Sequence, residues 1–208
     1  AIPLFIIMGE ILLESGVSKK IYSSLSSIFR HIPGGLLHTN IAVCTVFGAI
    51  SGSSLSTAAA VGSVAYPELS KRNYNEPMVV GSLAGGGTLG LLIPPSLSLL
   101  IYGALTETSI GKLFMGGILP GILMAILFML YIYIRCIKNP KLWNSDTCYE
   151  EKLSLSIIDL LKIWPIAFMI LAVMGSIVFG IATPTEAAGV GVISSLLLGL
   201  FWGDLSKK

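Results

Sequence analysis

The stretch FGAISGSSLSTAAAVGS, from Phe47 to Ser63, places serine, glycine and alanine inside an uncharged run. That run extends over residues 31–67, 37 positions without Asp, Glu, Lys or Arg. A straight helix of this length would measure about 55 Å, nearly twice the ~30 Å hydrocarbon core of a bilayer. The segment must therefore leave the membrane or fold back on itself, and we expect it to break at Ser51–Ser54.

The composition is that of a membrane protein. Of 208 residues, 54% are hydrophobic and 12% are charged, and the mean hydropathy is +0.86, whereas soluble domains carry about 25% charged residues. Further uncharged stretches cover residues 77–106, 113–134 and 163–185. Such stretches reach the ~20 residues that cross a bilayer as a helix. The sequence predicts an all-α integral membrane protein, a multi-span helical bundle.

Several other classes are disfavoured. The net charge of +2 comes with no basic stripe for nucleic acid. Cys44, Cys136 and Cys148 are widely spaced, which argues against a disulfide framework or a structural zinc site. The chain begins at Ala1 in an apolar stretch, with no visible signal peptide, so we expect a fragment of a longer protein.

The remaining segments follow from charge and periodicity. Residues 1–33 are expected to hold the end of a span and an amphipathic interfacial helix, ended by Pro33-Gly34-Gly35. Residues 113–134 form the clearest spanning helix. Residues 135–162 carry five Lys/Arg and four Asp/Glu and are placed on the cytoplasmic side. Residues 163–203 are expected to form two further membrane helices.

A break at Ser51–Ser54 turns residues 34–70 into a re-entrant helical hairpin, whose arms of roughly 16 residues are too short to span alone. Irregular backbone at this depth must be buried in protein or line a wet cavity. Ser51, Ser53 and Ser54 would offer hydroxyl and carbonyl oxygens to a cation, and the following helix N-terminus could hold an anion. The alternative is that these serines only cap two helix ends.

Residues 77–106 are predicted to form a discontinuous helix. Pro94-Pro95 must interrupt it, because a proline cannot donate a helical hydrogen bond and clashes with the preceding turn. Gly85, Gly86, Gly87 and Gly90 are expected to loosen that turn. A simple proline kink is the alternative. Two interruptions in adjacent apolar segments favour a binding site at the midplane, with Gly52, Pro94 and Ser96 as candidates for a substrate cavity.

These motifs carry a resemblance to a known family. GAISGSSLSTAAAVGS, then RNY and GGTLGLLIPPS, together with IPLFIIMGEILLESG, SIGKLFMGGILPG and GIATPTEAAGVGV, cover almost the whole chain. In these stretches the sequence resembles the large membrane subunit (DctM-like) of tripartite ATP-independent periplasmic (TRAP) transporters. The chain resembles the first half of such a subunit with the start of the second.

The resemblance implies sodium-driven import of small organic acids, C4-dicarboxylates or other carboxylates, by an inverted-repeat elevator in a bacterial or archaeal inner membrane. It implies two partners, a small membrane subunit and a periplasmic substrate-binding protein, and no cofactor besides the coupling ion. Carried over by motif, the sodium site comprises two groups: Ser51, Ser53 and Ser54, and Gly90, Ile93 and Pro95. The family's second hairpin is missing, so this chain alone is not expected to transport.

Four other points remain open. Glu186 is either an intramembrane proton carrier or part of a helix-capping box formed by Thr183, Pro184, Thr185 and Glu186. An intramembrane serine hydrolase would need Ser51 or Ser53 beside His31 or His38. A passive channel would need a polar pore lining that the spans do not show, and another sodium/anion symporter of similar architecture is a further alternative.

Overall fold

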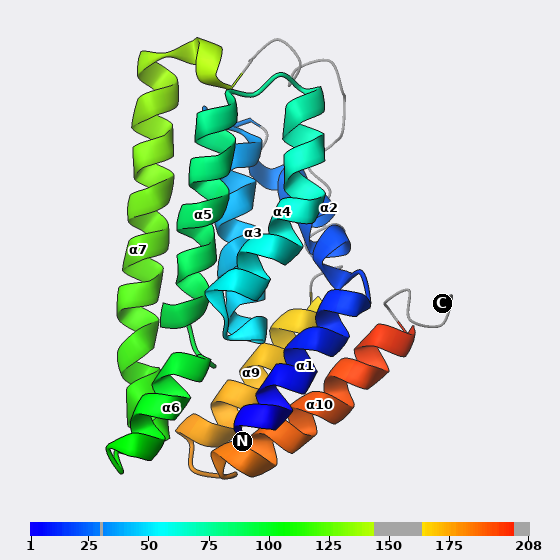
Figure 1. Cartoon of the computed structure of the whole chain (residues 1–208), viewed down its shortest axis with the longest axis vertical. Helices are drawn as coiled ribbons and strands as arrows, with labels where there is room; N and C mark the ends of the chain where they lie inside the picture. Colours follow the sequence, from blue (N-terminus) through cyan, green and yellow to red (C-terminus); the bar gives the residue numbers. More distant parts are fainter. Residues whose placement is uncertain (30, 144–163, 202–208) are drawn as a thin grey trace.

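The computed structural model describes residues 1–29, 31–143 and 164–201, and every regular element in these ranges is helical. The all-α membrane class is therefore confirmed. The elements are α1 (Ile2–Glu14), α2 (Val17–Phe29), α3 (Leu36–Ser51), α4 (Ser54–Lys71), α5 (Glu76–Leu92), α6 (Leu97–Leu105), α7 (Ile110–Lys138), the 3₁₀ turn η1 (Pro140–Leu142), α9 (Trp164–Val178) and α10 (Pro184–Phe201) (Figure 1).

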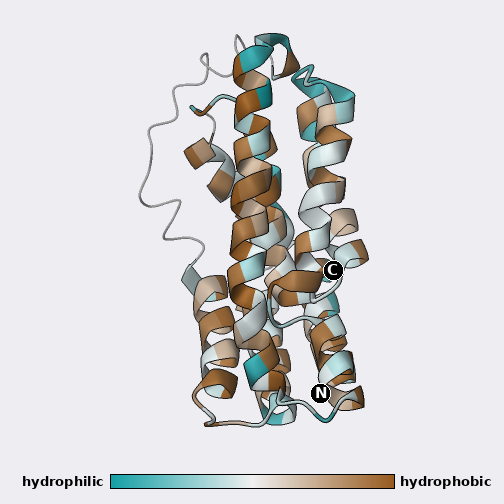
Figure 2. Ribbon diagram, turned by 90° about the vertical axis from the view of Figure 1, so that its left-hand side faces the viewer, coloured by the Kyte–Doolittle hydropathy of each residue, from teal (hydrophilic) through white to brown (hydrophobic). Residues whose placement is uncertain are grey.

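Three helical segments among the described residues are long and apolar enough to cross a membrane: Glu76–Leu105, which joins α5 to α6, then α7, and α10. Helix α7 has 29 residues and is about 44 Å long. It extends past the predicted 113–134 and includes Arg135 and Lys138, so the helix continues into the first residues of the predicted polar segment 135–162. Figure 2 shows α7 as hydrophobic along most of its length. The predicted polar residues 144–162 lie outside the described part.

Helices α3 and α4 form a helical hairpin that breaks where the sequence predicts (Figure 1). They have 16 and 18 residues, about 24 and 27 Å in length. Gly52 ends α3 in the left-handed conformation at φ +60°, and its N–H donates to Gly48 O at 2.9 Å. Ser53 is the N-cap of α4. The turn thus uses one glycine that can adopt positive φ and one serine that caps the next helix.

The predicted interruption at Pro94-Pro95 is also present, because α5 ends at Leu92 and α6 begins at Leu97. The expectation that the preceding glycines loosen the helix is wrong, since Gly85, Gly86, Gly87 and Gly90 all lie in regular α5. Three of them serve close packing. A Cβ atom on Gly86 would lie 2.9 Å from Cys44 Sγ, and one on Gly87 would lie 2.8 Å from Ala58 Cβ. Small residues let membrane helices approach each other closely.

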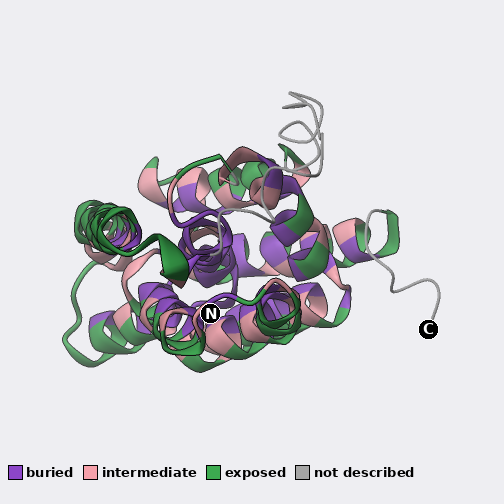
Figure 3. Ribbon diagram, turned by 90° about the horizontal axis from the view of Figure 1, so that it is seen from above, coloured by how far each residue is buried: buried purple, intermediate pink, exposed green. Residues whose placement is uncertain are grey.

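Helix α3 is the centre of the packing and contacts α1, α2, α4, α5 and α7. Its Leu37, Ile41, Phe47 and Ile50 are almost completely buried. Figure 3 shows buried residues gathered in the interior and exposed ones on the outer faces. Helices α1, α9 and α10 pack together beside the hairpin tip.

The amphipathic helix predicted near the N-terminus corresponds to α2, which packs against α3 and α4. Its buried face includes Val17, Ile21 and Tyr22. The sequence predicts that this helix continues up to Pro33, whereas α2 ends at Phe29 and Ile32 beyond it is 38% exposed. Arg30 lies outside the described residues.

The contact between Gly48 and α5 leads to a prediction about stability. A Cβ atom on Gly48 would lie 2.8 Å from Gly90 Cα and 2.9 Å from Gly90 N, and backbone atoms cannot move aside as a flexible side chain can. We expect Gly48→Ala to destabilise the purified protein by about 1–3 kcal/mol, measured by thermal unfolding in detergent micelles. Gly81→Ala is the matched control, because Gly81 also lies within a helix but has no atom within 4 Å of the added methyl group. Equal unfolding temperatures for the two variants would contradict the packing argument.

Candidate functional site

The two helix interruptions touch each other. The backbone N–H of Leu97, at the start of α6, donates to Gly52 O at 3.2 Å. A Cβ atom on Gly52 would lie 2.8 Å from Pro95 O, so only glycine permits this approach. The structure therefore brings together the hairpin tip and the break between α5 and α6, although 40 residues separate them in the chain.

Three oxygen atoms gather at the hairpin tip. Ser51 Oγ and Thr57 Oγ1 lie 2.7 Å apart in hydrogen-bond contact, and Thr57 Oγ1 donates to Ser53 O at 2.7 Å. Ser51 Oγ also lies 3.3 Å from Ser53 O. Ser51 is 5% exposed and Thr57 is completely buried. We call these three atoms (Ser51 Oγ, Ser53 O and Thr57 Oγ1) the oxygen triangle.

Gly90 of α5 closes one side of the oxygen triangle. A Cβ atom there would lie 2.9 Å from both Ser53 O and Thr57 Oγ1. Any residue other than glycine would therefore place a methyl group against two of the three oxygen atoms. Because Gly90 has no side chain, the backbone of α5 lies directly beside these two oxygen atoms.

The chemistry of the oxygen triangle fits a hard monovalent cation. All three atoms of the triangle are neutral oxygens that could coordinate a cation, and none of the residues that contribute them is titratable. The triangle lies at the C-terminal end of α3, with Gly90 two residues before the end of α5, and both helix ends carry partial negative charge. It also lies at the N-terminal end of α4, whose dipole is positive and offsets part of that charge. Carbonyl oxygens at interrupted helices and helix C-termini are the groups that coordinate sodium in transporters of this design.

The other two predicted serines of the hairpin, Ser53 and Ser54, use their oxygens differently. Ser53 contributes its carbonyl oxygen, while its hydroxyl accepts a 3.5 Å bond from Ser56 N as the cap of α4. Ser54 O lies beside Gly87, 3.1 Å from the position of an added Cβ. Ser54 therefore faces α5 one turn away from Gly90, and its contribution to ion binding remains a prediction.

The residues between α5 and α6 each make a different contact. Ile93 ends α5 by donating its N–H to Leu89 O, and its side chain packs against Gly121 of α7. Pro94 and Pro95 are buried, with Pro95 O beside Gly52. Ser96 is completely buried and its hydroxyl donates to Leu91 O at 2.6 Å. That bond satisfies a carbonyl that the prolines leave free, so Ser96 stabilises the break, and its place in a substrate cavity stays a prediction.

Thr57 was not among the residues predicted from the sequence. The available signal was its position four residues after Ser53, in an alanine-rich stretch. A threonine in a helix can donate its hydroxyl to the carbonyl four residues earlier, which places its oxygen at the hairpin tip.

The serine hydrolase arrangement is not formed. His38 lies near the start of α3 and Ser51 at its end, 13 residues or about 20 Å apart. A ring nitrogen of His38 is 2.9 Å from Pro33 O, and the ring stacks on Phe29. His31 lies in the turn before α3. Neither histidine can act as a base for Ser51 or Ser53 in this structure.

Glu186 belongs to a helix cap. Its carboxylate accepts hydrogen bonds from Thr183 N at 2.8 Å and Thr183 Oγ1 at 2.7 Å, and Glu186 N donates to Thr183 Oγ1 at 3.3 Å. Pro184 begins α10 and Thr185 follows it. The capping box predicted from the sequence is therefore formed.

Membrane-spanning helices, a helical hairpin and an interrupted helix in contact with its tip define a multi-span membrane protein with the architecture of a transporter. A family model described as "Tripartite ATP-independent periplasmic transporter, DctM component" matches residues 1–208, and the chain belongs to this family. The family comprises transporter components and not enzymes.

Relatives with different names align with nearly the whole chain. It is 37% identical over 203 residues to the C4-dicarboxylate TRAP transporter large permease protein of Pseudomonas aeruginosa, covering 97% of this chain and 46% of that protein. It is 33% identical to the ectoine/5-hydroxyectoine large permease protein of Ruegeria pomeroyi, covering 95% and 45%. It is also 33% identical to the sialic acid large permease protein of Vibrio cholerae, covering 96% and 46%. The chain thus spans about half the length of these relatives.

The two readings of Glu186 lead to opposite expectations. Glutamine can fill the same position in a capping box, so Glu186→Gln should retain both the unfolding temperature and transport by the complete subunit. Glu186→Ala removes the acceptor of the Thr183 bonds and should lower the unfolding temperature. Loss of transport in the glutamine variant, with stability unchanged, would instead identify a proton carrier.

Proposed function

We propose that the complete subunit containing this chain is the permease of a sodium-coupled importer of small organic acids. C4-dicarboxylates and other carboxylates are the proposed substrate class. Sodium is the coupling ion, and it binds at the oxygen triangle between the hairpin tip and α5. The observation that supports this most directly is the gathering of three neutral oxygens, from the buried Ser51 and Thr57 and the half-buried Ser53, at the contact between the hairpin tip and α5.

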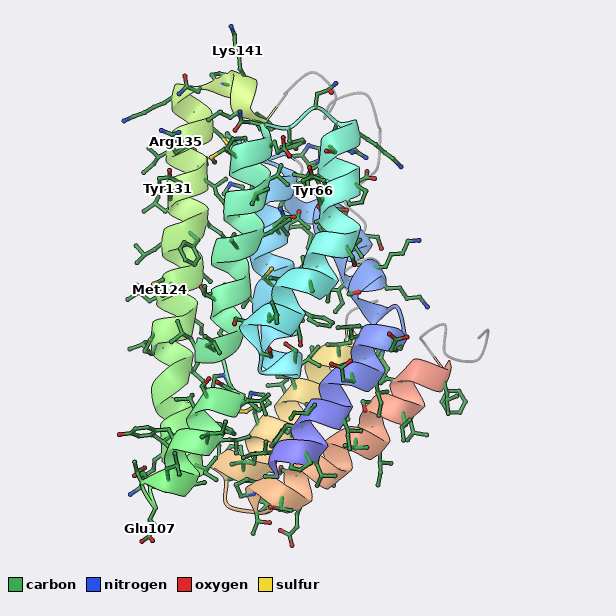
Figure 4. The ribbon with its side chains drawn as sticks, in the orientation of Figure 1. Tyr66, Glu107, Met124, Tyr131, Arg135 and Lys141 are labelled. Carbon is green, nitrogen blue, oxygen red and sulfur yellow. The ribbon has the colours of Figure 1, made fainter. Side chains whose placement is uncertain are left out.

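The charge distribution supports an orientation. Arg135 and Lys141 lie at one end of the molecule, and Glu107 lies at the opposite end (Figure 4). Lys138 ends α7 three residues after Arg135, and Lys71 ends α4, whose C-terminal end lies at the same end of the molecule (Figure 1). Because cytoplasmic loops carry an excess of Lys and Arg, we place this basic end in the cytoplasm. The hairpin then enters the membrane from the cytoplasmic side and is re-entrant.

The proposed partners are a small membrane subunit and a periplasmic substrate-binding protein, in a bacterial or archaeal inner membrane. We further propose that the two interrupted helices are one half of an inverted repeat, which moves as an elevator. A passive channel is less well supported, since the oxygen triangle is closed by the backbone of α5 and is not part of a continuous polar lining.

Thr57 provides the sharpest test of the oxygen triangle. Thr57→Val keeps the shape of the side chain but removes the hydroxyl, whereas Thr57→Ser keeps the hydroxyl. A polar contact to a charged group contributes about 1.5–3 kcal/mol of binding free energy. We therefore expect the valine variant, which lacks one such contact, to bind sodium at least about tenfold more weakly. The measurement is the rise in unfolding temperature of the complete subunit with NaCl, with choline chloride keeping the ionic strength constant.

Thr88→Val is the matched control for this experiment. Thr88 also donates its hydroxyl to a carbonyl of its own helix, Gly85 O at 2.6 Å, but it is exposed. Its sodium response should equal that of the unmodified protein. A Thr57→Val variant with an unchanged sodium response would overturn the site, and no response in the unmodified protein would overturn sodium binding itself.

A further inference from the structure

A small pocket opens at the hairpin tip, on the side that faces α1. Its volume is about 210 Å3. The lining residues come from three parts of the chain: Ile6, Gly9 and Glu10 of α1, Ser51, Ser53 and Ser56 of the hairpin, and Leu97 of α6. Two of the three residues of the oxygen triangle, Ser51 and Ser53, therefore also line this pocket.

The position of Glu10 is fixed by its neighbour Gly9. A Cβ atom on Gly9 would lie 3.1 Å from Ser51 Cα and 3.6 Å from Ser51 O, so the backbone of α1 packs directly on the end of α3. Glu10 follows at once and is the one charged residue that lines the pocket. The tight contact holds the carboxylate on the pocket side of the hairpin tip.

No contact within the described part of the chain explains why a glutamate stands at position 10. It makes no hydrogen bond or ion pair with the residues that the structure describes, in contrast to Glu14 one turn later, which does have an interaction. Apart from Glu14 at the C-terminal end, Glu10 is the one charged residue of α1, IPLFIIMGEILLE, and its side chain is exposed on the pocket side. A carboxylate within a membrane segment is costly and marks ion or substrate pathways.

We infer that Glu10 is the charged group that draws the cation to the oxygen triangle. The inference rests on the proposed function. The triangle itself is neutral, so it gives no long-range attraction to a cation. Glu10 does not belong to the triangle and acts on the ion through its field across the pocket. The same charge repels an organic acid, so the carboxylate substrate binds outside this pocket.

The size of the effect follows from Coulomb's law. Glu10 is exposed, so its charge acts through water. For two unit charges about 8 Å apart in water, the interaction changes the affinity for a monovalent ion by roughly twofold to threefold, and added salt reduces it further. We therefore expect Glu10→Gln to weaken sodium binding by about twofold at low ionic strength.

The experiment compares three variants of the complete subunit by the rise in their unfolding temperature with NaCl. Choline chloride keeps the ionic strength constant. Glu10→Gln removes the charge and keeps the shape, and Glu10→Asp keeps the charge on a shorter side chain. Glu14→Gln removes a charge from the same helix but outside the pocket. We expect a weaker apparent sodium affinity in Glu10→Gln, near-normal affinity in Glu10→Asp, and normal affinity in Glu14→Gln.

The unfolding temperature without sodium reports folding separately, and a structural defect would lower it in Glu10→Gln without changing the sodium affinity. Unchanged sodium affinity in Glu10→Gln would overturn the inference, as would an equal loss in Glu14→Gln. If Thr57→Val loses its sodium response while Glu10→Gln retains it, the oxygen triangle stands and only the role of Glu10 fails. If the unmodified protein does not respond to sodium, the proposed function fails as well.

Discussion

The close approach of α5 to the end of α3 is the contact on which the rest of the structure depends. Gly48 and Gly90 let the two backbones meet, and the Gly52–Leu97 hydrogen bond joins the two interruptions. Peptide groups released from a helix inside a membrane find no water, so each must be paired within the protein. Two separate breaks would each leave such groups unpaired. Placed against each other, they satisfy part of that need together.

The oxygen triangle has a second property that follows from this arrangement. Its hydroxyls and its carbonyl are bonded to one another, so no oxygen is left without a partner. A cation that binds there exchanges hydrogen bonds for ion contacts without a large rearrangement. The absence of a formal charge among its donors also limits the affinity. A carrier must release its ion as well as bind it, and weak neutral ligands favour release.

Much of the fold could be predicted from the sequence, because the main signals are local. An uncharged run too long for one span, with serines and a glycine at its centre, predicts the break at Gly52. Two consecutive prolines predict the break before Leu97. The roles of Gly86, Gly87 and Gly90 could not be predicted, since they depend on which helix lies opposite, and the local reading mistook packing glycines for flexible ones. The part that Thr57 plays could not be predicted for a similar reason, because the use of a hydroxyl depends on which oxygen atoms the fold brings within its reach.

The comparison with relatives bears on which ligand the hairpin tip serves. This chain is 37% identical to a protein named for C4-dicarboxylates, 33% to one named for ectoines and 33% to one named for sialic acid. The sequence identity of this chain to its relatives therefore differs little, although those relatives are named for chemically different solutes. A site shared by such proteins should bind what they have in common. The triangle of three neutral oxygens presents no charged group that would distinguish a dicarboxylate from a sugar acid. This supports assigning the hairpin tip to the cation and not to the organic substrate.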